Sequence, residues 1–366
     1  MKHKILNISF AINTLILLCC IYGFCVLTLL DKYWVDSYEN SAFFQNKTNL
    51  VNRAIILGID GAGNLFNAEA PNIRNLMKNG IYTLNGKSVM PTISAECWGS
   101  IFYSVPPKTH KLTNHLVESR NMSNPSITSL FKLTRQNFPD SEIYSYATWK
   151  AFDIGFFENY VFNEIYARFN DSDVIQQGIN CIKNKNPKLL FMYLGDVDRA
   201  GHHHVYQSEK YYQVLNDADK SILSVLQAMN EKHYFDDSLI IILSDHGGKG
   251  KRHGLGIKDM INVFFTAYSP HFPANMEISN YSIIDVSKIV AVSLGMAVPD
   301  DWIGKYPQEL TEYFREKQRK FVEKSVNDYM NSTFFLSIFL RMKTFFNLVQ
   351  IKARYYYHEF MLRSNL

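Results

Sequence analysis

Acidic and histidine side chains directly follow two strongly apolar runs of the sequence, a combination that suits a divalent metal ion. Asp60 ends the run "RAIILGID", and Asp245 and His246 follow "SLIIIL". Carboxylate oxygens and imidazole nitrogens are ligands of zinc and of other divalent transition ions. An acid after one apolar run is weak evidence, because turns also contain acids. An adjacent carboxylate and imidazole after a second run makes a metal site the better interpretation.

A second set of such side chains lies in "GDVDRAGHHHVY" and in the glycine-rich segment "GGKGKRHGLG". Asp198 and His202 stand four residues apart and could bind one ion if Gly201 lets the chain turn. His253 supplies a further imidazole. The neighbours in the triple-histidine run remain possible substitutes for His202, namely His203 and His204.

The stretch "VMPTISAECW" offers three candidate nucleophiles, Thr92, Ser94 and Cys97. A serine hydroxyl is a poor nucleophile at neutral pH, but a nearby metal ion stabilises its alkoxide. The residues alone leave open which of the three reacts, or whether the stretch is only a strand end followed by a polar turn.

The elements that position these residues are predicted to be buried strands alternating with helices. Five apolar runs of strand length recur in the chain: 53–60, 142–149, 188–196, 238–245 and 262–269. Unbroken apolar runs are typical of strands buried on both faces, and "APNIRNLMKNG" and "SEKYYQVLNDADKSILSVLQAMNEK" have helical periodicity. The pattern predicts an α/β three-layer sandwich with a mostly parallel central sheet. Ligands of such sheets bind beyond the carboxyl ends of the strands, where the acids fall.

The N-terminal segment predicts a membrane anchor. Residues 11–30 carry no charge, and about 20 such residues span a hydrocarbon core of about 30 Å. Lys2 and Lys4 precede the segment and favour a cytoplasmic N-terminus, so that the rest of the chain is extracellular or luminal. A cleaved signal peptide, and hence secretion, is the alternative.

We therefore expect a transmembrane signal anchor at 1–31, a stem at 32–51, a catalytic domain at 52–310 and a helical, aromatic-rich tail at 311–366. The tail contains Arg341 and Lys343, and its uncharged part is too short to span a bilayer. It packs on the domain or lies on the membrane surface.

Composition narrows the classes of partner. The chain has 366 residues and a net charge of +4 without a clustered basic stripe, so a nucleic acid duplex is not expected as a partner. Of five cysteines only Cys97 and Cys181 lie outside the apolar segment, too few for a disulfide framework. Five sequons predict a glycoprotein if the source is eukaryotic: Asn46, Asn121, Asn170, Asn280 and Asn331.

Taken together, the motifs "GIDG", "PTIS", "DRAGH", "SDHG" and "HG" appear in an order that resembles the alkaline phosphatase superfamily, in its type I phosphodiesterase and nucleotide pyrophosphatase branch. The resemblance covers about Arg53 to Pro307 and implies an alkaline phosphatase-like fold. It implies two divalent ions, with zinc preferred. One ion would be held by Asp60, Ser94, Asp245 and His246, and the other by Asp198, His202 and His253.

The same resemblance makes Ser94 the nucleophile that forms a covalent phospho-enzyme, with Asn114 in "PPKTHKLTN" holding a phosphoryl oxygen. Thr92 is then a structural hydroxyl and Cys97 a packing residue. Three side chains near these motifs are candidates for substrate binding: Trp98, Trp149 and Lys150. For the two tryptophans the alternative is packing in the core, and for the lysine it is exposure to solvent without a role in binding.

The activity expected from this resemblance is hydrolysis of a small phosphodiester or a phospholipid-type substrate. Ala95 stands where nucleotide pyrophosphatases commonly have an aromatic residue, which argues against a nucleotide. The residues beside Ser94 include no arginine that could clamp a dianionic monoester, which favours a diester. "CWGSI" lacks the Pro and Arg of the sulfatase motif. The alternatives are a phosphoryl-group transferase such as a phosphoethanolamine transferase and a catalytically inactive, metal-stabilised binding protein.

Overall fold

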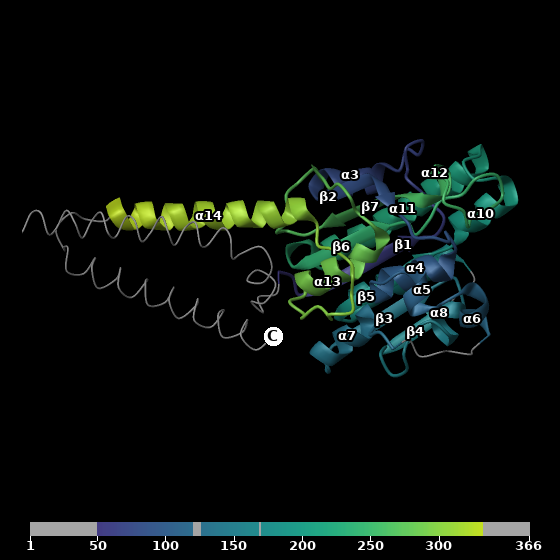
Figure 1. Ribbon diagram of the computed structural model, residues 1–366, viewed down its shortest axis with the longest axis horizontal. Helices are drawn as coiled ribbons and strands as arrows, with labels where there is room; N and C mark the ends of the chain where they lie inside the picture. Colours follow the sequence, from purple (N-terminus) through teal and green to yellow (C-terminus); the bar gives the residue numbers. More distant parts are fainter. Residues whose placement is uncertain (1–49, 120–125, 168–169, 332–366) are drawn as a thin grey trace, which may run out of the picture. The chain divides into compact units, whose positions relative to one another are not determined.

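Each of the five apolar runs forms a strand, and all of them lie in one eight-stranded sheet (Figure 1). They are β1 (Arg53–Ile59), β3 (Glu142–Ala147), β5 (Pro187–Leu194), β6 (Ser238–Leu243) and β7 (Asn262–Tyr268). The sequence did not indicate β2 (Ile81–Lys87), β4 (Glu164–Ala167) and β8 (Met276–Glu277). The residues of β2 alternate between buried and more exposed positions, so they form no unbroken apolar run.

The strand order is β4-β3-β5-β1-β6-β7-β2-β8. All neighbours from β4 to β6 are parallel, whereas β7 is antiparallel to both β6 and β2. The expected mostly parallel sheet is therefore confirmed, with one antiparallel strand inserted near an edge. Because β5, β1 and β6 are adjacent and parallel, the residues that follow them meet at one edge of the sheet.

The computed structural model describes residues 50–119, 126–167 and 170–331, which belong to a unit spanning Thr48–Phe334. The expected anchor, nearly all of the stem and the tail beyond residue 331 lie outside the described residues, as do Asn46 and Asn121. Within the described ranges, no helix combines the length and apolar character needed to cross a bilayer. Asn170 and Asn280 are exposed.

Helices pack on both faces of the sheet (Figure 1). On one face, Ile55 and Leu57 of β1 join a core with α3 (Pro71–Asn79), α9 (Asp171–Asn184) and α11 (Glu209–Glu231). On the other face, the rings of Trp98 and Phe102 in α4 (Ser94–Tyr103) lie 5.6 and 4.8 Å from that of Phe191 in β5. Each fully buried side chain of this size contributes about 1.5–3 kcal/mol. The layered α/β architecture is thus an observed property of the chain.

The remaining elements connect or flank these layers. The short helices are α5 (Pro107–His110), α6 (Asn114–Glu118), α7 (Leu130–Asn137), α8 (Ala151–Ile154), α10 (Asp196–His204), α12 (Lys258–Ile261), α13 (Val286–Ser293), η1 (Tyr234–Asp236) and η2 (Ile283–Asp285). The long helix α14 (Gln308–Asn331) begins three residues before the expected start of the tail. Its first turns pack on the domain, since Leu310 is buried and Glu309 Oε1 accepts a hydrogen bond from Ser279 N.

Candidate metal centre

Three side chains converge around the imidazole of His246. Its Nε2 atom lies 3.3 Å from Asp60 Oδ1, 3.5 Å from Asp245 Oδ2 and 3.3 Å from Ser94 Oγ. Asp60 follows β1, Asp245 and His246 follow β6, and Ser94 is the first residue of α4. Ligands bound at about 2.0–2.1 Å to a tetrahedral zinc ion lie about 3.3 Å from one another. The three distances from His246 Nε2 therefore agree with a zinc-sized ion bound beside this imidazole.

Two carboxylate oxygens of this first group have no other partner. Asp60 Oδ1 and Asp245 Oδ2 are buried and accept no hydrogen bond from the described residues. The other oxygens of the same groups are held: Asp245 Oδ1 accepts from Gly61 N at 3.1 Å, and Asp60 Oδ2 accepts from Trp98 Nε1 at 3.1 Å and from Tyr193 Oη at 2.5 Å. Buried carboxylate oxygens without partners are costly, and a bound cation would remove that cost.

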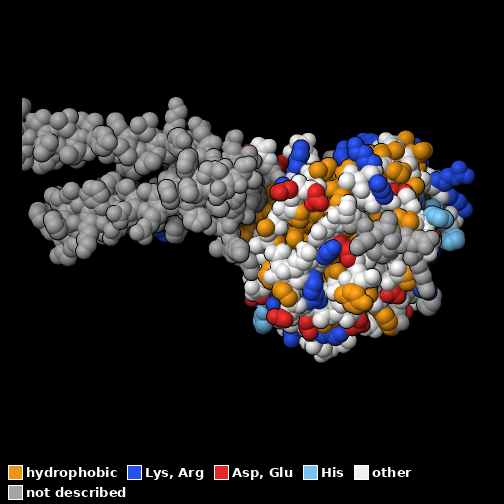
Figure 2. All heavy atoms as spheres, turned by 60° about the horizontal axis from the view of Figure 1, so that its bottom comes forward, with side chains coloured by type: hydrophobic (Ala, Val, Ile, Leu, Met, Phe, Trp, Pro, Cys, Tyr) orange, Lys and Arg blue, Asp and Glu red, His pale blue; other side chains and the backbone are white. Residues whose placement is uncertain are grey.

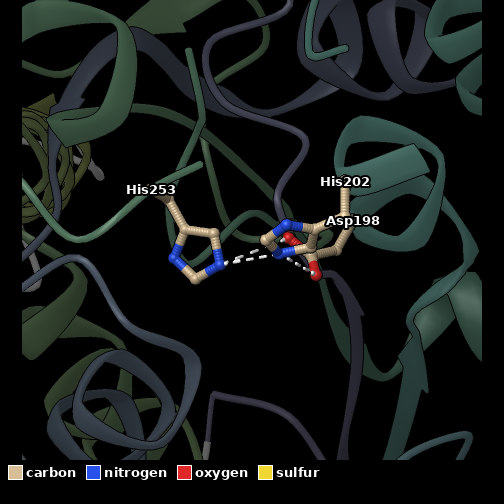
Figure 3. A group of neighbouring side chains, drawn as sticks. All are labelled: Asp198, His202 and His253. Atoms are coloured by element: carbon tan, nitrogen blue, oxygen red, sulfur yellow. Dashed lines mark hydrogen bonds and ion pairs between the residues drawn. The ribbon is translucent and has the colours of Figure 1, made fainter. Parts of the chain in front are cut away.

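A second group combines Asp198, His202 and His253 (Figure 3). His202 Nε2 lies 3.4 Å from Asp198 Oδ2, and His253 Nε2 lies 3.9 Å from Asp198 Oδ1. The Nε2 atoms of the two histidines lie 3.0 Å apart. The groups adjoin, because the rings of His246 and His253 stack at 4.0 Å and Asp198 also lies near Asp60 and His246.

The backbone orients all three imidazole rings. Nδ1 of His202, His246 and His253 lies 2.9, 3.0 and 2.7 Å from the carbonyl oxygens of Lys251, Gly247 and Thr92. A carbonyl oxygen only accepts, so a neutral ring carries its proton on Nδ1 and directs the Nε2 lone pair into the centre. Two lone pairs then face each other across 3.0 Å between His202 and His253. This arrangement favours a cation, as in metal sites where the second ring nitrogen is held by a backbone carbonyl.

Burial and mutual repulsion disfavour the charged forms of two carboxylates in the centre. Burial, followed by the charge of Asp198, raises the pKa of Asp60 to about 7. Burial and then the charge of Asp60 raise the pKa of Asp245 well above its usual value. Burial alone would raise the pKa of Asp198, but its contacts with His202, Tyr206 and the other two imidazoles outweigh burial and lower the pKa to about 2. Divalent cations would relieve the repulsion among these three carboxylates.

Ser94 and Asn114 lie on adjoining helix ends. Ser94 is the first residue of the ten-residue helix α4, whose N-terminus favours negative charge. Asn114 begins α6, and its Oδ1 accepts a hydrogen bond from Ala95 N at 2.9 Å. The asparagine is therefore held beside the serine with its Nδ2 protons still available to a ligand.

The other two candidates of "PTISAEC" have structural contacts. The Thr92 hydroxyl donates to Leu255 O at 3.1 Å and accepts from Gly254 N at 2.8 Å, so it joins the serine segment to the His253 segment. Cys97 is fully buried, its Sγ lies 3.2 Å from Ser88 Oγ, and burial raises the pKa of its thiol well above the usual value. Both observations agree with the structural roles expected for them.

The three expected substrate-binding residues occupy different environments. Trp98 is fully buried beneath Asp60 and lines no surface, which corrects the expectation of a pocket residue: its indole supports a carboxylate instead. Trp149 is half-buried just beyond β3, its Nε1 donates to Glu118 Oε1, and its ring lies 6.4 Å from that of Tyr193. Lys150 is exposed. Trp149 and Lys150 thus remain candidates for substrate binding.

The role expected for Gly201 in the second group is wrong. Asp198 and His202 lie on one face of α10, one helical turn apart, so no turn at Gly201 is required. Glycine is needed there because a Cβ atom would lie 2.5 Å from the ring of Tyr206. His203 and His204 lie on the same helix but are exposed and are not part of the group.

Two tyrosines near the centre were not anticipated from the sequence. Tyr193 donates to Asp60, and Tyr206 donates to Asp198 Oδ1. A tyrosine within the otherwise aliphatic end of a buried strand, as in "FMYLGD", is the available signal, because a buried hydroxyl needs a partner. Gly58 and Gly61 of "GIDG" also have roles: a Cβ at Gly58 would lie 2.2 Å from Trp98, and one at Gly61 would lie 2.6 Å from Asp198 Oδ1.

Comparison with known proteins identifies the class to which this fold and centre belong. Human ectonucleotide pyrophosphatase/phosphodiesterase family member 1 is 24% identical over 193 residues, which cover 48% of this chain and 21% of the human protein. The chain therefore matches about a fifth of the length of that curated relative.

Solved structures share the fold. Murine ectonucleotide pyrophosphatase/phosphodiesterase 5 superposes with a TM-score of 0.58 at 15% identity, covering 68% of this chain and 96% of the murine one. An inactive form of that enzyme has been solved in complex with AMP. The lipoteichoic acid synthase LtaP from Listeria monocytogenes gives a TM-score of 0.56 at 18% identity, covering 73% and 77% of the two chains. A 2-O GAG sulfatase gives 0.55 at 14%, covering 70% and 73%.

The family description "type I phosphodiesterase / nucleotide pyrophosphatase" matches residues 54–332, which is more than half of the chain. The chain belongs to that family, as its motifs imply. The family is metal-dependent, and the Asp/His groups described above can bind metal ions.

Proposed function

We propose that the chain is a metal-dependent phosphodiester hydrolase that uses Ser94 as its nucleophile. The observation that carries the proposal is the position of the Ser94 hydroxyl, which lies at the N-terminus of α4 and 3.3 Å from His246 Nε2 within a buried Asp/His group. Membership of the family supports phosphoester hydrolysis as the reaction. A binding protein has no need for a hydroxyl in that position.

We propose that these side chains hold two divalent ions and divide between them as the family resemblance implies. Asp60, Asp245, His246 and Ser94 would hold one ion, and Asp198, His202 and His253 the other. Zinc is preferred because the ligands are imidazoles and carboxylates spaced for tetrahedral binding. The ions would supply positive charge to the serine alkoxide and to the phosphoryl oxygens.

The residues of the chain then carry out two displacements. Ser94 Oγ forms a bond to phosphorus, and the bond between phosphorus and the leaving oxygen breaks. The proton of Ser94 is transferred through solvent to the leaving oxygen, which departs as an alcohol. Water next attacks the phosphoserine, the bond between Ser94 and phosphorus breaks, and the phosphomonoester leaves. Asn114 Nδ2 donates to the non-bridging oxygen as charge develops there, since its Oδ1 is fixed by Ala95 N.

For the substrate we propose a small phosphodiester or a phospholipid-type molecule, bound beside Trp149 and Lys150. We further propose that the domain works outside the cytoplasm as a type II membrane protein or, after signal cleavage, as a secreted one. That part of the proposal rests on the uncharged residues 11–30 and on Lys2 and Lys4.

The test is hydrolysis of p-nitrophenyl esters by the metal-replete protein, with and without a chelator. The panel contains the bis-phosphate, monophosphate, thymidine monophosphate, phosphorylcholine and sulfate esters. Ser94→Ala should lower kcat on the order of a thousandfold or more, as loss of a nucleophile does elsewhere. Ser100→Ala is the matched control, because Ser100 lies on the same helix and its hydroxyl is 3.2 Å from His110 Nε2.

The other outcomes separate the alternatives. Full activity in Ser94→Ala, or activity that a chelator does not change, contradicts the mechanism. A phosphoryl-group transferase would release p-nitrophenol faster when an acceptor alcohol is added and would yield a new diester. An inactive, metal-stabilised binding protein would hydrolyse none of the esters although it binds metal.

A further inference from the structure

One exposed loop beside the metal centre carries both apolar and basic side chains. Residues 249–258 read "KGKRHGLGIK", and the side chains of Leu255 and Ile257 are 60% and 39% exposed. Met90, which is 49% exposed, lies against the loop, since a Cβ placed at Gly256 would lie 3.1 Å from its Sδ. Three large apolar side chains thus face solvent together. Adjoining exposed apolar residues are typical of interaction surfaces.

The same loop has a strong excess of positive charge. Its basic residues are Lys249, Lys251, Arg252 and Lys258, all of them exposed. The nearest acid in sequence is Asp259, whose Oδ2 lies 3.2 Å from Lys249 Nζ. At the end of the molecule where α10 lies, Figure 2 shows Lys and Arg side chains gathered beside histidines and hydrophobic side chains. The face therefore offers cations and apolar groups to the same partner.

Backbone hydrogen bonds hold this loop in place. Lys249 and Arg252 pair through their backbones at 2.9 and 3.2 Å, and Gly250 O accepts from Tyr206 N at 2.7 Å. Leu255 O accepts from the Thr92 hydroxyl, two residues before Ser94. Because the loop is already ordered, binding costs little conformational entropy.

We propose that the 249–258 loop and Met90 form a docking surface for a bilayer that contains anionic phospholipids. Anionic headgroups complement the four basic residues, and the acyl region of the bilayer would receive the side chains of Leu255, Ile257 and Met90. A soluble polyanion would match the charges but would leave the three apolar side chains in water. The combination of both properties favours a lipid surface.

Docking in this way would have a consequence for catalysis. His253 lies within the loop, so the second metal group would be at the level of the phospholipid headgroups. This consequence rests on the proposed function, whereas the binding itself does not. The surface differs from the expected N-terminal anchor and from the C-terminal tail, since it is formed by the folded domain.

The experiment measures flotation of the full-length protein with vesicles. The protein is first reconstituted in nanodiscs of neutral phosphatidylcholine, so that its apolar segment 11–30 is already occupied. It is then mixed with vesicles of phosphatidylcholine alone or with about one third phosphatidylserine, a strongly anionic surface. Wild type should float with the anionic vesicles and not with the neutral ones.

Two loop variants and one control test the residues. Each basic residue near an anionic surface strengthens binding about fivefold, so Lys251→Gln with Arg252→Gln should weaken flotation about 25-fold. Leu255→Ser with Ile257→Ser should weaken it about tenfold or more, from the loss of buried methylene groups. Lys78→Gln with Lys232→Gln removes the same charge from exposed sites elsewhere and should change nothing.

The flotation results can overturn the docking surface in several ways. Failure of wild type to bind anionic vesicles, or equal binding by all variants, overturns the docking surface. If only the charge variant fails, and it also loses binding to heparin, the surface recognises a polyanion and the proposal is wrong. Absence of ester hydrolysis together with the expected flotation pattern would overturn the proposed function and leave the docking surface supported.

Discussion

Replacing Tyr193 by phenylalanine should weaken metal binding without disturbing the core. The Tyr193 hydroxyl donates to Asp60 Oδ2 at 2.5 Å, and its ring packs 5.4 Å from Trp98 and 4.9 Å from Phe152. Tyr193→Phe removes the hydroxyl and retains the ring contacts. A hydrogen bond to a charged group contributes about 1.5–3 kcal/mol, which corresponds to about 10–100-fold in affinity. Trp98 still donates to the same oxygen, so we expect the lower end, about tenfold.

Competition with a chromogenic chelator measures the zinc affinity of the wild type and of the variant. Tyr103→Phe is the control, because the Tyr103 hydroxyl is also buried and donates to Phe156 O at 3.1 Å, away from the centre. Both variants should lose about 1 kcal/mol of unfolding free energy. Only Tyr193→Phe should bind zinc more weakly. Equal zinc affinities in the two variants would refute the inference that Asp60 is a ligand oriented by Tyr193.

Two further predictions concern the backbone at Gly61 and the titration of His110. A non-glycine residue in the left-handed region costs about 1–2 kcal/mol. Gly61→Ala should lower the unfolding free energy measured in urea by more than this, because φ is +67° and the new Cβ would lie 2.6 Å from Asp198 Oδ1. Gly250→Ala, at φ +60° with open space around it, should lose only the about 1–2 kcal/mol of the backbone conformation, and equal losses in the two variants would contradict the proposed contact. Burial lowers the pKa of His110 from 6.5 to about 4, so between these pH values the native state binds fewer protons than the unfolded chain. The resulting contribution to the unfolding free energy is about 3 kcal/mol. It is complete above about pH 6.5 and decreases as the pH falls toward 4. Unfolding of His110→Gln should therefore depend less on pH in that window than unfolding of wild type, and parallel curves would count against this assignment.

The strands next to the centre could be predicted because their burial is uniform. Every residue of β6 is buried and nearly every residue of β1 and β5, so these segments read as unbroken apolar runs and their ends mark the acids. β2 alternates between faces, and the four residues of β4 are all partly exposed, so neither has such a run. The sequence pattern therefore indicated the centre of the sheet better than its edges.

The grouping of the candidate ligands could not be predicted from the strand ends alone. Nothing in the spacing of Ser94 and His246, which are 152 positions apart, indicates that their side chains meet, and only the resemblance to a family suggested it. The hydroxyl donors that support these carboxylates could not be predicted for the same reason. Tyr193 and Tyr206 act through a single hydroxyl each, which in sequence looks like any aromatic core residue.

Ala95 shows how local packing limits the substrates that the centre can recognise. It follows Ser94 on the first turn of α4, its side chain is fully buried, and its backbone N–H is bound to Asn114. An aromatic side chain at this position would have to displace its neighbours, so a stacking partner for a base has to come from another segment. Trp149 is a half-buried aromatic residue whose ring lies 6.4 Å from that of Tyr193, the donor to Asp60. It is therefore the side chain that the proposed substrate would contact in place of an aromatic residue after Ser94.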